Sequence, residues 1–169
     1  MALLQIIEYP DSFLSKPVHQ VTEIDGVLQQ HIDEMAETMY QAPGIGLAAP
    51  QVGLDQCVLV YDVSQRDVSR ELHVLINPRI VCQEGEILSE NEGCLSVPDY
   101  RSDVVRFASV QVEGFNRDGK PLSFSAEGYL AIVLQHEIDH LQGILFIDRI
   151  SALKRSLYKK RIKKRMKET

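Results

Sequence analysis

Hydrophobic residues recur at helical spacing in three parts of the chain. Residues 25–41 carry an apolar stripe behind Asp25, which can cap the first turn, so an amphipathic helix is predicted there. The stripe comprises Leu28, Ile32, Met35, Ala36 and Met39. A second, mostly apolar helix is predicted from about Glu127 to a stop at Gly143. A third helix is expected to begin after Ser151, which can serve as its N-cap.

Between the first two helices the apolar positions follow the shorter period of β-strands. Residues 57–63 form a continuous apolar run typical of a buried strand, and 73–82 predicts two extended pieces broken at Asn77. Residues 103–115 alternate like a strand, and a turn at 116–120 leads into another short strand. Helices toward both ends with antiparallel strands between them predict an α+β fold rather than a βαβ array.

Composition is that of one compact domain. With 169 residues and 44% apolar content, the chain can bury a single core. Its three cysteines are odd in number and not paired in spacing, which argues against a disulfide framework. The opening apolar run is too short for a signal peptide, and no stretch is long enough to cross a bilayer. We therefore expect a cytoplasmic protein without a membrane partner.

Charge is distributed unevenly along the chain. Residues 154–167 hold nine Lys and Arg, whereas the preceding 153 residues hold nine against 23 Asp and Glu. The expected division is a main body, 1–150, and a basic C-terminal helix of the same domain, 151–169. Leu153 and Leu157 are expected to dock this helix and leave the cations outward. Such a run is either a solvated helix face or an electrostatic footprint for nucleic acid.

The segment "HEIDH" carries the strongest chemical signal. His136 and His140 stand four residues apart, so on a helix both imidazoles share one face with Glu137 beside them. The surrounding helix is apolar and expected to be largely buried, where unpaired polar groups are costly. A bound metal would satisfy both histidines. Two imidazoles rarely hold a catalytic ion alone, so a third protein ligand is needed.

The spacing itself leaves the third ligand open. The metallopeptidase pattern with a downstream histidine fails, because Phe146 occupies that position. No glutamate lies within 141–167, and Asp148 is the only carboxylate there. Upstream candidates are His19, His31, His73 and Cys94. A thiolate from Cys94 would bind iron or zinc well, although a lone cysteine is more often a small core residue.

The segment "GIGLAA" (44–49) has the form of a dinucleotide-binding fingerprint, and Asp62 follows at a suitable distance. That fingerprint requires a strand, a turn and then a helix. Here the preceding segment is helical and Pro50 would lie inside the following helix. A dinucleotide site is therefore rejected.

Three motifs in order and register resemble the signature motifs of peptide deformylases. They are "GIGLAAPQ" (44–51), "EGCLS" (92–96) and "HEIDH" (136–140), and the similarity extends over nearly the whole chain. The resemblance implies antiparallel strands packed around a central metal-binding helix, with an N-terminal helix and the basic C-terminal helix. It also implies hydrolytic removal of the N-formyl group from the N-terminal methionine of newly made proteins, with release of formate.

The same resemblance assigns roles to individual residues. It implies that Cys94 joins His136 and His140 as the third metal ligand, and that Fe²⁺ is the usual ion with Zn²⁺ as a substitute. Glu137 would carry the proton as general base and then general acid. The side-chain amide of Gln51 and the backbone N–H of Leu95 would stabilise the developing oxyanion.

Further residues are expected around the substrate. They are Gly44, Ile45, Gly46, Arg101, Tyr129, Ile132 and Val133. The resemblance implies that Arg101 lies near the substrate path and that Glu92 braces the site. The alternatives are one of few cations in an acidic body for Arg101 and a surface role for Glu92. The glycines would let backbone approach the substrate and metal closely, or simply form a turn. The apolar members would line a pocket for methionine or pack as ordinary core. The acid-rich segment before Cys94 is in no motif but could form the pocket edge.

Two rival classes share part of this pattern. A zinc endopeptidase shares "HEIDH" but needs the downstream ligand that is missing here. A structural metal domain needs a closed four-ligand cage, and no fourth Cys or His stands near the motifs. The expected partners are formyl-methionyl nascent peptides and, by resemblance, the ribosome surface through the basic C-terminal helix. No DNA partner is expected.

Overall fold

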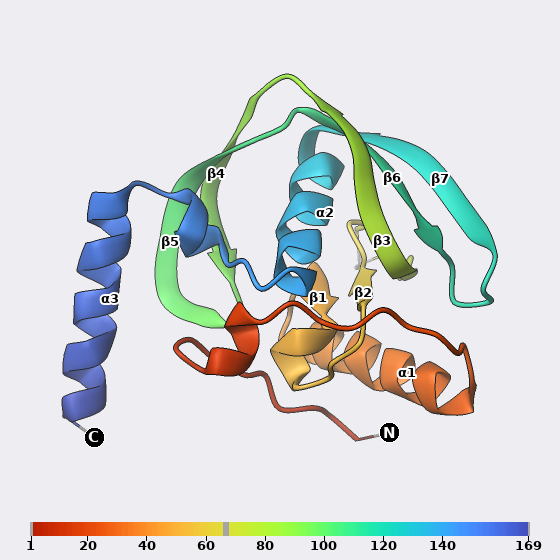
Figure 1. Ribbon diagram of the computed structural model, residues 1–169, viewed down its shortest axis with the longest axis horizontal. Coiled ribbons are helices and arrows are strands. Elements are labelled where there is room, and N and C mark those ends of the chain that lie inside the picture. The colour runs from red at the N-terminus through yellow and green to blue at the C-terminus, as the bar shows by residue number, and fades with distance from the viewer. Residues whose placement is uncertain (1, 66–67, 169) are drawn as a thin grey trace.

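The computed structural model describes residues 2–65 and 68–168 (Figure 1). In chain order the helices are α1 (Gly26–Gln41), α2 (Gly128–Leu141) and α3 (Ala152–Lys167), with short 3₁₀ turns at Ser12–Ser15, Ala49–Val52 and Phe146–Arg149. The strands are β1 (Gly46–Ala48), β2 (Val58–Tyr61), β3 (His73–Glu84), β4 (Ile87–Cys94), β5 (Val97–Arg106), β6 (Ser109–Phe115) and β7 (Pro121–Glu127).

Two antiparallel sheets enclose one helix. The five-stranded sheet has the order β1-β2-β3-β6-β7, and β4 and β5 form a separate two-stranded sheet. Helix α2 lies between them and contacts strands of both, while α1 packs on β1 and β2 and α3 stands beside β5 at one edge (Figure 1). The predicted α+β fold with a central helix is confirmed.

Helix α2 is held on its sheet side by apolar contacts. Ala131, Leu134 and Ile138 belong to a buried cluster with residues of β2, β3 and β6. The helix ends where the sequence predicted, because Gly143 adopts φ +78°, and a Cβ there would lie 2.7 Å from the backbone of Ser15. Packing on that side leaves the opposite face of α2 for polar chemistry.

Helix α1 forms for the reasons read from its sequence. The Asp25 carboxylate accepts a hydrogen bond from Leu28 N at 2.9 Å, and the predicted apolar stripe is buried against β1, β2 and β3. His31 lies at the boundary of this helix, 3.0 Å from Gln56 Oε1, and is not near the metal-ligand set.

Two strand predictions were wrong in detail. Strand β3 is continuous through Asn77, which forms an irregularity in register with φ +51° and bonds the backbone of Val21 through its side chain. Residues 103–115 are not one strand but parts of β5 and β6, which lie in different sheets. Gln135 of α2 pairs with both backbone groups of Phe107 at this corner, a contact that periodicity along the chain cannot reveal.

The expected docking of α3 was also wrong. Leu153 and Leu157 are 70% and 58% exposed, whereas Tyr158 and Ile162 are buried in a cluster with residues of β5 and the Phe146 turn. Both pairs have i, i+4 spacing, so spacing alone does not predict which pair is buried. In the structure the larger ring of Tyr158 fills the interface. Among the residues that the structure describes, no helix has the length and apolarity needed to span a membrane.

Candidate metal centre and active site

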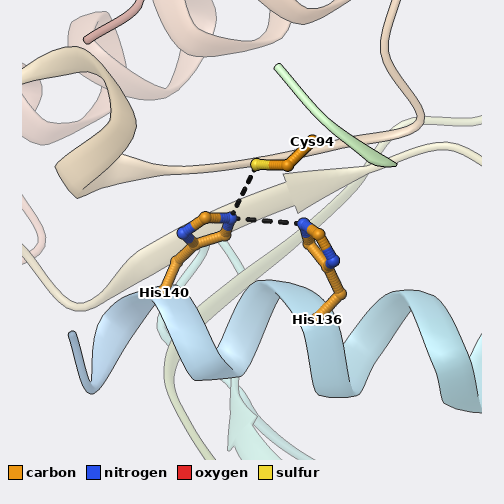
Figure 2. Close-up of side chains that lie close together, drawn as sticks. All are labelled: Cys94, His136 and His140. Atoms are coloured by element: carbon orange, nitrogen blue, oxygen red, sulfur yellow. Dashed lines mark hydrogen bonds between the residues drawn. The ribbon is translucent and has the colours of Figure 1, made fainter. Parts of the chain in front are cut away.

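Three side chains from two elements converge on one point. Cys94 ends β4, and His136 and His140 project from the same face of α2 (Figure 2). His140 Nε2 lies 3.3 Å from Cys94 Sγ and 3.2 Å from His136 Nε2, and all three donor atoms lie within 4.8 Å of one another. The sheet β4–β5 therefore brings the cysteine to the two histidines across 42 residues of chain.

These separations fit a metal ion. In a tetrahedral site with bonds of about 2.0 Å to nitrogen and about 2.3 Å to sulfur, neighbouring donor atoms lie about 3.3–3.6 Å apart. Two facing imidazole nitrogens would otherwise place lone pairs against each other unless one carries a proton. A divalent ion satisfies both nitrogens and the thiolate at once.

A carboxylate behind His136 fixes the orientation of its ring. Glu92 Oε1 lies 2.6 Å from His136 Nδ1, and Arg106 binds both oxygens of the same carboxylate. Burial alone would raise the pKa of Glu92, but hydrogen bonds from His136 and Arg106 outweigh it and lower that pKa to about 2. The anion keeps the proton of His136 on Nδ1 and directs Nε2 toward the metal position.

The electrostatics of the two histidines differ. Burial would lower the pKa of His136, but Cys94 and Glu92 outweigh it and hold that pKa well above its ordinary value. Burial and then the neighbouring His136 hold the pKa of His140 well below its ordinary value. Without a metal ion, the opposite shifts favour a proton on His136 and none on His140. A metal ion bound between the sulfur and the two rings would have to displace that proton.

Arg106 is the centre of a buried ion network that sequence reasoning missed. Besides Glu92 it binds Asp139 at 2.8 Å, and Asp139 also accepts two hydrogen bonds from Arg149. The available signal was a charged residue at an inward position of an alternating strand, next in that alternation to the apolar Val104. Removing one member of such a buried network leaves a charge unpaired, at a cost of about 3–5 kcal/mol.

Glu137 is buried beside the ligands. It is 5% exposed, its Oε1 lies 3.9 Å from His136 Nε2, and its Oε2 has no hydrogen-bond partner in the described part of the chain. Burial raises the pKa of Glu137 to about 7. A carboxyl group with that pKa can both take and return a proton near neutral pH.

Glycine is required where the first motif meets this carboxylate. A Cβ on Gly46 would lie 2.8 Å from Cγ, Cδ and Oε1 of Glu137, and one on Gly44 would lie 2.8 Å from Cδ1 of Leu95. Gly46 therefore allows β1 to pack directly on the general-base candidate, and Gly44 allows the segment before β1 to pack on the residue after Cys94.

The orientation of Gln51 is fixed by three neighbours. Its Oε1 accepts from Ala48 N at 3.0 Å, while Nε2 donates to Ser96 Oγ at 3.1 Å and lies 3.6 Å from Cys94 Sγ. The amide nitrogen therefore faces the ligand cluster. Ser96, fully buried and also bonded through its N–H to the thiol sulfur at 3.4 Å, is a second residue that sequence reasoning missed.

The cluster opens into a cavity of about 900 Å³. All seven expected substrate residues line it: Gly44, Ile45, Gly46, Arg101, Tyr129, Ile132 and Val133. Val133 is also buried in the core cluster, so this one residue both lines the cavity and packs in the core. The acid-rich segment forms the opposite edge through Ser89, Glu90 and Asn91, as expected for this part of the chain.

A largely buried Cys-His-His set beside a carboxyl group, at the base of an accessible cavity, defines a metal-dependent hydrolase. The sequence profile of the polypeptide deformylase family matches residues 3–156. The chain is 52% identical over 168 residues to the peptide deformylase of Desulfosudis oleivorans, covering 99% of this chain and 97% of that protein. It is 54% identical over 163 residues to that of Thermodesulfovibrio yellowstonii, covering 96% and 98%.

Solved structures agree with the sequence comparisons. The crystal structure of a peptide deformylase from Legionella pneumophila superposes with a TM-score of 0.89 at 43% identity, covering 98% of this chain and 96% of that one. That of Ehrlichia chaffeensis in complex with actinonin gives a TM-score of 0.89 at 36% identity, covering 98% of each chain. The chain belongs to the peptide deformylase family, enzymes that remove the N-formyl group from nascent peptides. This membership rules out the endopeptidase and structural-metal alternatives.

Substitutions should separate metal binding from proton transfer. We expect Cys94→Ser and His136→Ala to lose bound metal, because each removes one of the three candidate ligands. Glu137→Ala should retain metal and lose about 10²–10⁴-fold in kcat, the usual contribution of a positioned acid or base. Metal content by elemental analysis, measured beside formate release, tests both. Full metal occupancy in Cys94→Ser would overturn the ligand assignment.

A methyl group at Gly46 should displace the Glu137 carboxyl group. The flexible side chain can move aside, so Gly46→Ala should fold and bind metal, yet lose roughly 10²-fold in kcat because the proton carrier is misplaced. Gly26→Ala is the matched control, since no atom lies within 4 Å of a Cβ there, and its kcat should not change. Equal kcat values for the two variants would contradict the proposed contact.

Proposed function

We propose that deformylation in this enzyme uses one divalent ion held by Cys94, His136 and His140, with Glu137 carrying the proton. The observation that supports this most directly is the convergence of three donor atoms within 4.8 Å beside a buried carboxyl group. A bound ion supplies a Lewis acid and lowers the pKa of water. Every other step is assigned to side chains of the chain itself.

Glu137 takes one proton from the water whose oxygen attacks the formyl carbon. As the bond between carbon and nitrogen breaks, the same carboxyl group returns the proton to the departing amine, and formate is released with the free N-terminus. Its burial against Gly46 keeps solvent away and supports the raised pKa that both transfers need.

Two donors are proposed for the negative charge that develops on the formyl oxygen. Gln51 presents Nε2 to the cluster with its amide already oriented by Ala48 and Ser96, so little reorganisation is needed. The backbone N–H of Leu95, directly after the Cys94 ligand, is the second. The Leu95 side chain packed against Gly44 holds that backbone in place.

The methionine side chain is proposed to enter between α2 and the first motif. Ile132 and Val133 offer apolar surface on the helix, Ile45 offers it from the motif, and Tyr129 stands half exposed at the rim. A flexible thioether suits such a pocket. Arg101, which donates to Asn91 O at 3.2 Å, is proposed to border the path of the peptide.

Fe²⁺ is the proposed working ion, with Zn²⁺ as a less active substitute. One thiolate and two imidazoles suit either metal. An iron site with a thiolate ligand is open to oxidation at the metal and at Cys94.

Formate release from formyl-Met peptides tests the activity and the metal together. The enzyme prepared under nitrogen with Fe²⁺ should release formate and lose activity in air, whereas the Zn²⁺ form should be stable in air and slower. A peptide without the formyl group is the control and should remain uncleaved. Equal activity with both ions, unaffected by oxygen, would contradict iron as the working metal.

We further propose that 151–169 extends the catalytic unit 1–150 and holds it at the ribosome, in the cytoplasm where nascent chains emerge. Its arginines contact the body of the domain: Arg155 donates to Asp148 O, while Arg161 and Arg165 contact Asp99. The lysines of α3 are exposed. A basic surface on an otherwise acidic domain is suited to phosphate binding.

Neutralising exposed lysines tests this role better than truncation, which would remove the buried Tyr158 and Ile162. The double variant Lys160→Gln and Lys164→Gln should weaken ribosome co-sedimentation several-fold and reduce the salt slope of log K by about 1–2. Hydrolysis of a short formyl-peptide should be unchanged.

The matched control neutralises Lys16 and Lys120, two exposed lysines outside α3. It removes the same charge and should bind ribosomes like the wild type. Equal loss of binding in both double variants would show only a net-charge effect and contradict a dedicated surface on α3.

A further inference from the structure

The wall of the cavity on β5 is a bulge that leaves the sheet ladder. Glu92 pairs with Ser102 and Cys94 pairs with Val97, so four residues of β5, 98–101, stand opposite the single residue Gly93. All four line the cavity. Their backbone is not positioned by the regular pairing that holds the rest of the hairpin.

The side chain of Arg101, a residue of the bulge, attaches the bulge to β4. The Arg101 guanidinium packs over Gly93, where a Cβ would lie 3.1 Å from its Cζ, and it donates to Asn91 O. Within the bulge Asp99 has φ +60°, a left-handed conformation that costs less free energy for aspartate than for most residues and that nearby contacts can support.

Those contacts come from α3, which stands beside β5 (Figure 1). Arg161 donates a hydrogen bond from Nη2 to the Asp99 carbonyl at 3.0 Å, and its guanidinium lies 5.5 Å from the Tyr100 ring and 5.3 Å from the Tyr158 ring. The rings of Tyr100 and Tyr158 are themselves 4.6 Å apart. Arg165 adds a longer, exposed ion pair to the Asp99 carboxylate at 3.8 Å.

We propose that Arg161 is a positioning residue for substrate specificity. From outside the cavity it fixes the backbone conformation of the bulge at 98–101, which faces the peptide residues that follow formylmethionine. This rests on the proposed function, in which α2 and Ile45 receive the methionine side chain. The cavity wall on β5 is then available to the substrate residues that follow the formylmethionine. The metal ligands and Glu137 lie on β4 and α2, so the chemical step does not depend on Arg161.

The consequence is a change in KM that depends on peptide length. Arg161→Ala should raise KM for a formylated tetrapeptide by about three- to tenfold, the factor expected from losing one hydrogen bond and a ring contact. KM for formyl-Met-Ala should change less than twofold. With both substrates kcat and metal content should match the wild type. Arg161→Lys should recover part of the effect, because an ammonium group can donate to the Asp99 carbonyl but lacks the planar face that stacks on Tyr100.

Lys163→Ala is the matched control, since it removes one exposed cation from the same helix. Its KM should equal that of the wild type. The proposal is overturned by an unchanged tetrapeptide KM in Arg161→Ala, by the same change in Lys163→Ala, or by parallel loss of kcat, metal and melting temperature. Absence of formate release by the wild type would instead contradict the proposed function, so the two failures are distinguishable.

Discussion

The hydrogen bond from His136 to Glu92 ties the two-stranded sheet to helix α2, whose other side packs on the five-stranded sheet. Glu92 belongs to β4 and His136 to α2, and Arg106 of β5 extends the same buried contact to Asp139, one turn of helix away from His136. Burial of these charges is tolerable only because each has an opposite charge within hydrogen-bond distance. The network sets both the ring plane of His136, a proposed metal ligand, and the placement of β4, which ends at Cys94.

The interior of the site is costly to form. Among the described residues, neither Oε2 of Glu137 nor Nδ1 of His140 has a hydrogen-bond partner, and both atoms are buried. Polar groups in that state destabilise the fold unless something compensates for them. The apolar clusters on the far side of α2 and around α1 provide the compensating stability. The fold can therefore tolerate unpartnered polar atoms in the site, because apolar packing elsewhere in the core stabilises it.

Helix α3 divides its cations by residue type. The planar guanidinium groups of Arg155 and Arg161 reach backbone carbonyls of the domain, and Arg161 also stacks on aromatic rings. The compact, strongly hydrated lysine ammonium groups remain at the surface. One helix can therefore support the cavity wall from its inner face while it offers an outer face to a polyanion.

Local patterns were sufficient for features whose partners lie within a few residues. The cap at Asp25, the stop at Gly143 and the shared face of His136 and His140 all follow from helical periodicity and backbone sterics. The family motifs chose Cys94 from four candidate ligands and added Gln51, because no spacing argument could supply the roles proposed for them.

Contacts between elements were beyond the reach of the sequence. The split of 103–115 between two sheets occurs where the Gln135 side chain pairs with the Phe107 backbone, and the docking of α3 follows the surface that receives Tyr158. Arg106 and Ser96 acquire their roles only when β5 and the turn after Cys94 meet α2 and Gln51. Periodicity shows which face of an element is apolar, but only packing in three dimensions decides which other element that face meets.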